Sequence, residues 1–178
     1  MKHYLVIGGT GMLQAAVLDW NQEGHKVTVI ARTEKKLRRL AECAAHSERL
    51  RTIQADYHQL ESFQKKLEDV PPPDIIVSWI HRSGNSAIQA LCNTYGNASK
   101  RIELFHIKGS SAHDPLQNYV PHYPDTIDYY EVILGFQLTG STSRWLTNEE
   151  IVKGVEKAVK QRHSRYIVGT IEPWNARP

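Results

Sequence analysis

The start of the chain constrains the fold most, because three glycines separate a short apolar run from an amphipathic one. Residues 4–7 are continuously apolar, as expected of a strand buried on both faces, and residues 8–11 read Gly-Gly-Thr-Gly. From residue 12 to residue 20 apolar side chains recur at helical spacing, until Gly24 ends the pattern. We therefore predict a strand, a tight turn and a helix whose pattern opens at Gly11.

The same alternation continues along the first 107 residues. Further strands are predicted at residues 27–31, 52–55, 74–80 and 102–107, and further helices at residues 33–44, 60–70 and 86–95. Strands that alternate with helices form a mostly parallel sheet with right-handed crossovers. We therefore expect an α/β fold with a doubly wound, Rossmann-like sheet in three α/β/α layers.

The regular pattern ends after residue 108. Residues 109–126 contain three prolines and no helical period, which predicts a long irregular loop, and such loops are often functional. A strand over 129–138, a helix behind a capping box at 147–150 and a closing strand over 166–171 complete the prediction. A chain of 178 residues with this pattern is expected to form a single domain spanning residues 1–178.

Composition excludes several classes of protein. A formal net charge of +3 is too small to indicate nucleic-acid binding, and no run reaches the ~18 apolar residues of a membrane span. The N-terminal apolar stretch is interrupted by glycines, so we expect no leader and a cytoplasmic location. Cys43 and Cys92 are expected to be buried, reduced thiols. The histidines lack metal-ligand spacing, so no metal site is expected.

The glycine turn has the layout that a dinucleotide diphosphate needs. Glycines let backbone N–H groups approach the phosphates, and the start of the following helix adds a favourable dipole. The residues predicted to bind this diphosphate are Gly8, Gly9, Thr10, Gly11, Met12 and Leu13. The motif's third glycine normally lets the helix pack closely on the strands, but this position is Gln14 here. The alternative is a plain strand–helix turn of a flavodoxin-like domain.

The end of the second strand indicates which dinucleotide is preferred. A carboxylate at this place would bind the ribose hydroxyls of NAD(H), but the residue is Arg32, 21 positions after Gly11. A guanidinium can bind a 2′-phosphate through two hydrogen bonds, so NADP(H) is predicted over NAD(H), with Thr33 and Lys35 assisting. The alternative for the lysine is that it belongs to the solvated face of a helix.

Asp56 and Tyr57 follow the third strand. The Asp56 carboxylate is a candidate acceptor for the adenine amino group, and as a candidate N-cap of the next helix it has a second possible role.

Together these residues resemble the short-chain dehydrogenase/reductase superfamily over roughly residues 3–112. The resemblance rests on the runs Val6-Ile7-Gly8-Gly9-Thr10-Gly11-Met12-Leu13, Ala31-Arg32, Ala55-Asp56, Val77-Ser78-Trp79 and Gly109-Ser110-Ser111-Ala112. It is strongest to the small atypical members. It implies that Ser78, Trp79 and Ile80 line the way to the nicotinamide. It also implies that Ser110 or Ser111 takes the place of the catalytic serine.

One family element is missing from this sequence. The family's proton donor is a tyrosine followed four residues later by a lysine, and no tyrosine here has that lysine. Tyr123, 13 residues after Ser110, and His81, just beyond the fourth strand, are the candidate proton donors. Lys108 at the end of the fifth strand either replaces the ribose-binding lysine or faces solvent.

Two functions follow from this combination. The first is an NADP(H)-dependent oxidoreductase acting on a small carbonyl or alcohol substrate. The second is a catalytically inactive NADP(H)-binding redox sensor or regulatory protein, because the phosphate turn is intact and the catalytic pair is absent. Substrate specificity is expected in residues 109–126 and 139–146, and a homo-oligomer through the last helix and strand is a further expectation.

Overall fold

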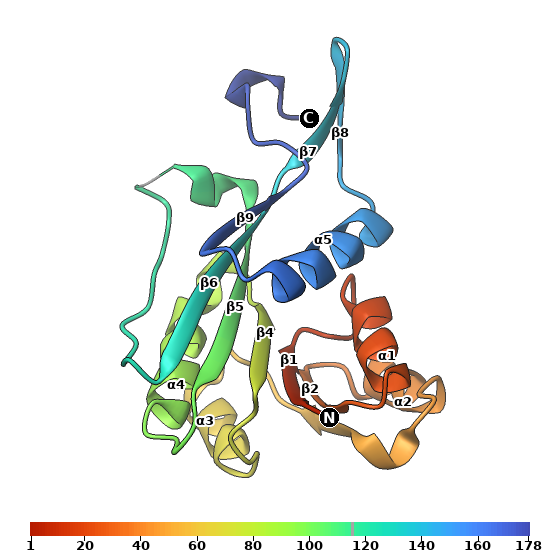
Figure 1. The fold of residues 1–178 in the computed structure, drawn as a ribbon, viewed down its shortest axis with the longest axis vertical. Coiled ribbons are helices and arrows are strands. Elements are labelled where there is room, and N and C mark those ends of the chain that lie inside the picture. The colour runs from red at the N-terminus through yellow and green to blue at the C-terminus, as the bar shows by residue number, and fades with distance from the viewer. Residues whose placement is uncertain (115) are drawn as a thin grey trace.

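A seven-stranded sheet forms the centre of the protein in the computed structural model, which describes residues 1–114 and 116–178 (Figure 1). Its strands are β1 (His3–Ile7), β2 (Lys26–Ala31), β3 (Leu50–Gln54), β4 (Ile75–Trp79), β5 (Ile102–Gly109), β6 (Ile127–Leu134) and β9 (Arg165–Val168). Their order is β3-β2-β1-β4-β5-β6-β9, and every neighbouring pair is parallel. The predicted parallel, doubly wound sheet is therefore confirmed.

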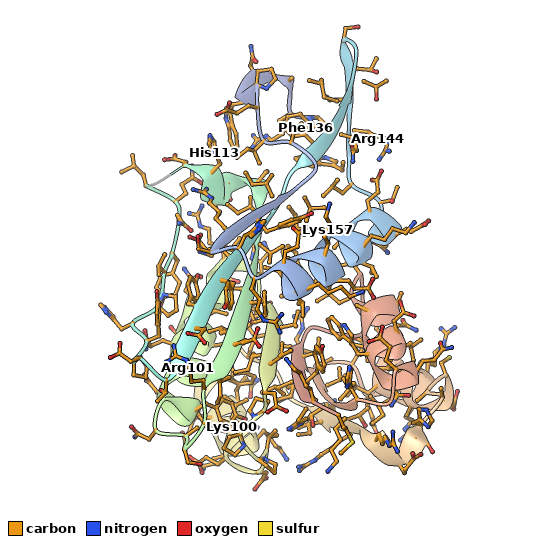
Figure 2. The ribbon with its side chains drawn as sticks, in the orientation of Figure 1. Lys100, Arg101, His113, Phe136, Arg144 and Lys157 are labelled. Carbon is orange, nitrogen blue, oxygen red and sulfur yellow. The ribbon has the colours of Figure 1, made fainter. Side chains whose placement is uncertain are left out.

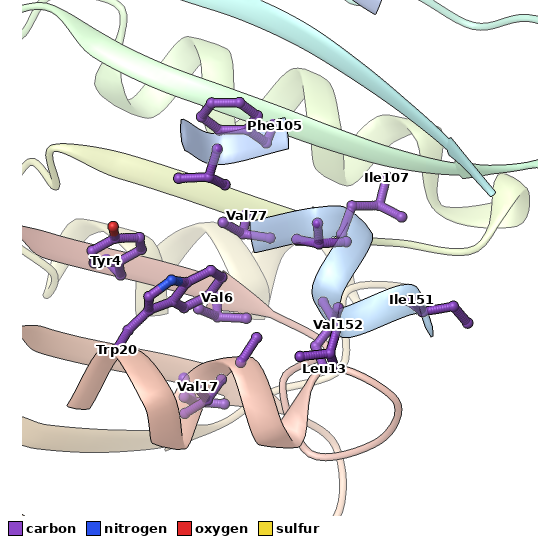
Figure 3. Packing of buried hydrophobic residues seen from close by; sticks show 14 of the residues in the cluster. Tyr4, Val6, Leu13, Val17, Trp20, Val77, Phe105, Ile107, Ile151 and Val152 are labelled. Carbon is purple, nitrogen blue, oxygen red and sulfur yellow. The ribbon is translucent and has the colours of Figure 1, made fainter. Parts of the chain in front are cut away.

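Five α-helices are described, and they cover both faces of this sheet. They are α1 (Gln14–Gln22), α2 (Glu34–Glu42), α3 (Leu60–Glu68), α4 (Asn85–Tyr95) and α5 (Asn148–Gln161). One hydrophobic cluster joins the sheet to α1, α2 and α5, and a second joins the opposite face to α3 and α4. Figure 3 shows the first cluster, in which Trp20 of α1 lies against Tyr4, and Leu13 lies near Val152 of α5. The three α/β/α layers are thus present as predicted.

Continuous apolar strands explain why both faces need cover. In β1 and β4 successive side chains point to opposite faces, and Val6 and Val77 enter the first cluster while Leu5 and Ile76 enter the second. Burying one such side chain stabilises the fold by about 1.5–3 kcal/mol, so neither face can be left to solvent.

The crossover from β5 to β6 differs from the earlier ones, because its described residues contain no α-helix. Only the short 3-10 helix η3 (Ser110–His113) interrupts it, as the irregular pattern over 109–126 predicted, and residue 115 lies outside the described residues. The remaining 3-10 helices are η1 (Ser47–Arg49), η2 (Arg82–Gly84) and η4 (Trp174–Ala176).

Beyond β6 the chain leaves the sheet. A single strand over 129–138 was predicted, but β6 ends at Leu134 and Gly135 follows, where an added Cβ would lie 2.0 Å from the Thr170 carbonyl oxygen. The next residues form an antiparallel hairpin of β7 (Phe136–Thr139) and β8 (Thr142–Trp145), which projects at the top of Figure 1. Phe136 and Arg144 lie at this end of the molecule, and Lys100 and Arg101 at the other (Figure 2).

Two further expectations were wrong in detail. α1 begins at Gln14 rather than at Gly11, because residues 8–13 form the turn itself. Cys43 is exposed, whereas Cys92 is buried as expected. The reason is that α2 ends at Glu42, so Cys43 lies beyond the buried stripe formed by Leu37 and Leu40.

The predicted capping box at the start of α5 is confirmed. The Thr147 hydroxyl accepts the Glu150 N–H, and the Glu150 carboxylate accepts the Thr147 N–H. Arg144 also binds both Glu150 carboxylate oxygens at 2.9 Å. Among residues 1–114 and 116–178, no helix is long and apolar enough to cross a membrane.

Candidate functional site

The glycine turn lies at the carboxyl end of β1, between β2 and β4. Gly8 has φ +82°, a conformation that side chains disfavour, and an added Cβ would lie 2.7 Å from the Trp79 carbonyl oxygen. Its N–H donates to the Ile30 carbonyl oxygen at 3.0 Å, which ties the turn to β2. The positive φ and the nearby carbonyl oxygen of β4 therefore require glycine at position 8.

The rest of the turn presents unused backbone donors. None of the amide N–H groups of residues 9–13 has a hydrogen-bond acceptor within the described chain. Gly11 is exposed, and an added Cβ there would meet no described atom within 4 Å. Backbone donors that converge at a helix start are what a phosphate group binds. The turn therefore fits a dinucleotide diphosphate.

Close packing of the helix on the strands occurs at Gly9, and so a glycine at position 14 is not needed. An added Cβ at Gly9 would lie 3.0 Å from methyl carbons of Val6, Val17 and Val29. The helix and two strands thus approach each other at Gly9, and Gln14 can be the first residue of α1 without crowding.

Arg32 follows β2 directly and is exposed, with no salt bridge to a described residue. Its carbonyl oxygen accepts a hydrogen bond from Gln54 Nε2 at 3.0 Å, which holds the backbone but leaves the guanidinium available. Thr33 is the N-cap residue of α2, but its side chain makes no capping hydrogen bond. Lys35 is exposed on the first turn of that helix. Arg32, Thr33 and Lys35 thus lie between the end of β2 and the first turn of α2, and their binding of a 2′-phosphate stays a prediction.

Asp56 is not the N-cap of the next helix, because α3 begins at Leu60 with Gln59 as its cap. Its carboxylate instead accepts the His58 N–H at 3.0 Å, and this backbone hydrogen bond lowers the pKa of Asp56. The helix-cap alternative was therefore wrong. The Tyr57 hydroxyl accepts the His81 N–H at 3.2 Å and so joins the ends of β3 and β4.

A cavity of about 280 Å³ opens at the carboxyl ends of β4 and β5. It is lined by Trp79, Ile80, His81, Arg82, Asn85, His106, Lys108, Gly109, Ser111, Ala112, Gln117 and Tyr119. Five residues singled out from the sequence therefore meet here: Trp79, Ile80, His81, Lys108 and Ser111. Residues 139–146, expected to contribute to specificity, lie in the β7–β8 hairpin and directly after it, and they do not line the cavity.

Three other predicted residues lie outside this lining. Ser110 is buried in η3, and Ser78 is fully buried in β4 with no described hydrogen-bond partner for its hydroxyl. Tyr123 is 44% exposed and stacks on Tyr129, with 5.1 Å between the ring centroids. The structure does not bring Tyr123 to the cavity with Ser111, and its role as proton donor stays a prediction.

A buried polar cluster forms part of the cavity wall, and of its members Lys108 alone was singled out from the sequence. Lys108 is 7% exposed, and its ammonium donates to Asn118 Oδ1 at 2.7 Å, to the Tyr119 carbonyl oxygen at 2.7 Å and to Glu131 Oε2 at 2.9 Å. The expectation that this lysine faces solvent was wrong. Its three donors are all used, so it is not available to hold a ribose in this arrangement.

His106 and Tyr129 form the second part of this polar cluster. His106 Nδ1 lies 2.8 Å from the Tyr129 hydroxyl, and the Lys108 ammonium lies 5.5 Å from the centre of the Tyr129 ring. Burial, followed by the nearby Lys108 charge, lowers the pKa of His106 to about 3. Burial, followed by the Glu131 charge, raises the pKa of Tyr129 well above its usual value. Both side chains are therefore neutral at pH 7.

The sequence contains a signal for this cluster in the alternation of β5 and β6. Ile102 and Leu104 point to the α3/α4 face, and the next two residues on that face are His106 and Lys108. Polar residues at alternate positions near the carboxyl end of a buried strand mark a site, although they do not reveal their partners across the sheet.

Comparison with known proteins bears on the fold. No protein-family model matches the sequence, and no curated protein matches it. A solved short-chain dehydrogenase/reductase family protein has a TM-score of 0.72 at 16% identity, covering 94% of this chain and 96% of its own. A short-chain dehydrogenase from Sphingobium yanoikuyae in complex with NADPH has a TM-score of 0.70 at 14% identity, with 99% and 91% covered. An actinorhodin polyketide ketoreductase with NADPH has a TM-score of 0.71 at 12% identity, with 96% of each chain covered.

The chain has the fold of the short-chain dehydrogenases and reductases. The resemblance inferred from the sequence motifs is thereby confirmed at the level of fold. Within that short-chain dehydrogenase fold, the described residues of the β5–β6 crossover contain no α-helix, and no described helix carries a tyrosine followed four residues later by a lysine.

Proposed function

We propose that the protein binds NADP(H) and acts as an oxidoreductase on a small carbonyl or alcohol substrate. The observation that carries this proposal is the row of unused amides at residues 9–13, with the unpaired Arg32 guanidinium at the end of the neighbouring strand. The two fold neighbours solved with NADPH support the same cofactor.

The chain's own residues would bind the cofactor and orient the substrate. Residues 8–13 hold the diphosphate, and Arg32, with Thr33 and Lys35, holds the 2′-phosphate. A bound nicotinamide supplies or accepts the hydride. Ser111 and His81 face the cavity at the carboxyl end of the sheet, where they can hydrogen-bond a substrate oxygen.

Cofactor preference is tested by Arg32→Asp. A hydrogen bond to a charged group contributes about 1.5–3 kcal/mol, so NADPH affinity should fall by about 10- to 100-fold and NADH affinity should change far less. Both dissociation constants are measured by fluorescence titration. Arg39→Asp is the matched control, because it makes the same charge change on the exposed face of α2 and should alter NADPH affinity by less than about threefold. Equal losses for the two cofactors would remove the 2′-phosphate assignment.

A second candidate function is cofactor binding without turnover, as in a redox sensor or regulatory protein. It is favoured by the occupied donors of Lys108 and by the helix-free β5–β6 crossover in the described chain. Incubation of the NADPH complex with a panel of carbonyl compounds separates the two functions. Tight binding without oxidation of the cofactor on any compound would favour the sensor.

A further inference from the structure

His106 is held rigidly at the back of the cavity. It lies inside β5 and pairs in register with Ser78 of β4 and Glu131 of β6, so backbone hydrogen bonds fix the strand on both sides. His106 is 3% exposed and nevertheless lines the cavity. A ligand in the cavity would therefore meet an imidazole that has little freedom to move.

Hydrogen bonding determines which imidazole nitrogen carries the hydrogen. The Tyr129 hydroxyl keeps its proton because burial raises its pKa, and His106 Nδ1 is the only acceptor that the described residues offer it. Tyr129 therefore donates and Nδ1 accepts. Since the ring is neutral, its one hydrogen lies on Nε2.

The Nε2–H group is directed to the cavity rather than to protein. It has no hydrogen-bond partner among the described residues, and it is not among the fully buried polar atoms that lack one. Because His106 lines the cavity, the accessible edge of its ring is the one that faces this space. The cavity thus contains a neutral hydrogen-bond donor, His106 Nε2–H, that is available to an oxygen acceptor of a ligand.

The charges around the cavity indicate what else the ligand carries. None of the described residues that line it is an aspartate or glutamate, and the Lys108 charge is balanced by Glu131. Arg82 lines it, makes no salt bridge with a described residue and donates from Nη1 to Gln117 Oε1 at 3.0 Å. The remaining guanidinium donors of Arg82 are available to a carboxylate. A volume of 280 Å³ is at the small end for ligand sites.

We propose that this cavity binds a small oxo acid, with its carbonyl oxygen on His106 Nε2–H and its carboxylate at Arg82. The inference names the substrate class of the proposed oxidoreductase and so rests on that function for any turnover. A neutral N–H can stabilise negative charge that develops on a carbonyl oxygen while keeping its own hydrogen. Tyr129 is a positioning residue, because it acts only by fixing the tautomer of His106.

The tautomer is tested without any ligand by long-range ¹H–¹⁵N spectra of protein labelled at histidine. Wild type should show His106 as the Nε2–H form, unchanged between pH 5 and pH 8. Tyr129→Phe should give a mixture of tautomers. Tyr123→Phe is the matched control, since this exposed ring stacks on Tyr129 but makes no hydrogen bond to His106, and it should leave the spectrum unchanged. An Nδ1–H form, or protonation of His106 near pH 6.5, would overturn the proposal.

The ligand is tested with 2-oxobutanoate and with 2-butanone, its analogue lacking the carboxylate, in the presence of NADP⁺ so that nothing is reduced. The oxo acid should bind at least tenfold more tightly and shift the His106 Nε2–H signal. Arg82→Gln should remove that preference and leave NADP⁺ affinity unchanged. Equal affinity for the two compounds, or a loss of NADP⁺ affinity in Arg82→Gln, would contradict the assignment.

The two proposals fail in different ways. If NADP⁺ does not bind but the oxo acid still shifts His106, the oxidoreductase function is wrong and the ligand assignment stands. If NADP⁺ binds and 2-oxobutanoate leaves His106 unchanged, the ligand assignment is wrong and the cofactor site stands.

Discussion

The two halves of the sheet, around β1 and β4 and around β5 and β6, are covered differently on their α3/α4 face. Around β1 and β4 the face is apolar apart from Ser78, and α3 and α4 bury it through residues such as Phe63 and Leu91. Around β5 and β6 the described part of the crossover is a loop without an α-helix, and the strands carry His106, Lys108 and Glu131. A loop brings backbone carbonyls and polar side chains that need partners, so the strands beneath it supply polar groups. The absent helix and the buried polar cluster are thus one feature of the fold.

The largest expected effect tests whether this polar cluster holds the second half together. Lys108→Met removes the partner of Glu131, which lies half-buried beside Asn118, and should lower the free energy of unfolding by about 3 kcal/mol. The measurement is urea unfolding followed by tryptophan fluorescence. The double variant Lys108→Met/Glu131→Gln removes both charges and should recover at least half of the loss. A single variant as stable as wild type would show that the cluster contributes nothing to stability.

A smaller effect is expected where the first half is packed most closely. Gly9→Ala places a Cβ 3.0 Å from three valine methyl carbons and should cost about 1–2 kcal/mol of unfolding free energy. Gly11→Ala is the matched control, because its Cβ meets no described atom within 4 Å, and it should change stability by less than about 0.5 kcal/mol. Similar losses in both variants would mean that the lost stability comes from a changed turn conformation and not from packing at Gly9.

Helix starts in the two halves differ as well. Thr147→Ala removes a capping hydrogen bond at α5 and should cost about 1 kcal/mol. Thr33→Ala at the start of α2 removes a side chain that makes no capping bond, so it should cost clearly less. Thermal unfolding of the two variants provides the comparison, and an equal loss would contradict the assigned caps.

The smallest effect concerns the contact between the halves, where Glu156 of α5 faces Asp19 of α1. Burial first, and then the Asp19 charge and a hydrogen bond to it, raise the pKa of Glu156. A carboxyl whose pKa is higher in the folded state stabilises the fold when protonated, and this contribution is lost as the pH rises through the folded pKa. Glu156→Gln should therefore raise the free energy of unfolding above that of wild type by less than about 1 kcal/mol at pH 8, and should not change it at pH 4.

Glu149→Gln is the control for this pH dependence. The Lys153 hydrogen bond lowers the pKa of Glu149, so this carboxylate stabilises the fold above its unfolded pKa. Glu149→Gln should therefore lower the free energy of unfolding at pH 8, whereas Glu156→Gln should raise it. Urea unfolding of both variants at pH 4 and pH 8 measures these opposite changes.

Much of the first half could be predicted from the sequence, because local pattern and final environment agree there. Apolar runs such as residues 4–7 form buried strands. The glycine turn lies where the backbone of β4 comes too close for a side chain at Gly8. The second half was predicted less well. Gly135 ends β6 because of a carbonyl oxygen from residue 170, and no local pattern reveals a contact that distant.

The candidate site shows the same division. Ser111 and His81 were found because they follow strand ends, which is a local property. The importance of His106 was missed, and Lys108 was named without its partners. Their contacts depend on Tyr129, Asn118 and Glu131, which lie on other segments. Alternation along β5 indicates which face these side chains occupy, but only the pairing of β5 with β6 determines their partners.

Because β5 continues unbroken from Ile102 to Gly109, its imidazole belongs to the framework of the sheet, while η2 and the segment after Gly109 form the walls around it. Exchanging those walls would alter which molecules are admitted and leave the proton on Nε2 where it is. A laboratory seeking new selectivity in this scaffold should therefore diversify residues 82, 85, 111, 117 and 119 and keep the two central strands constant.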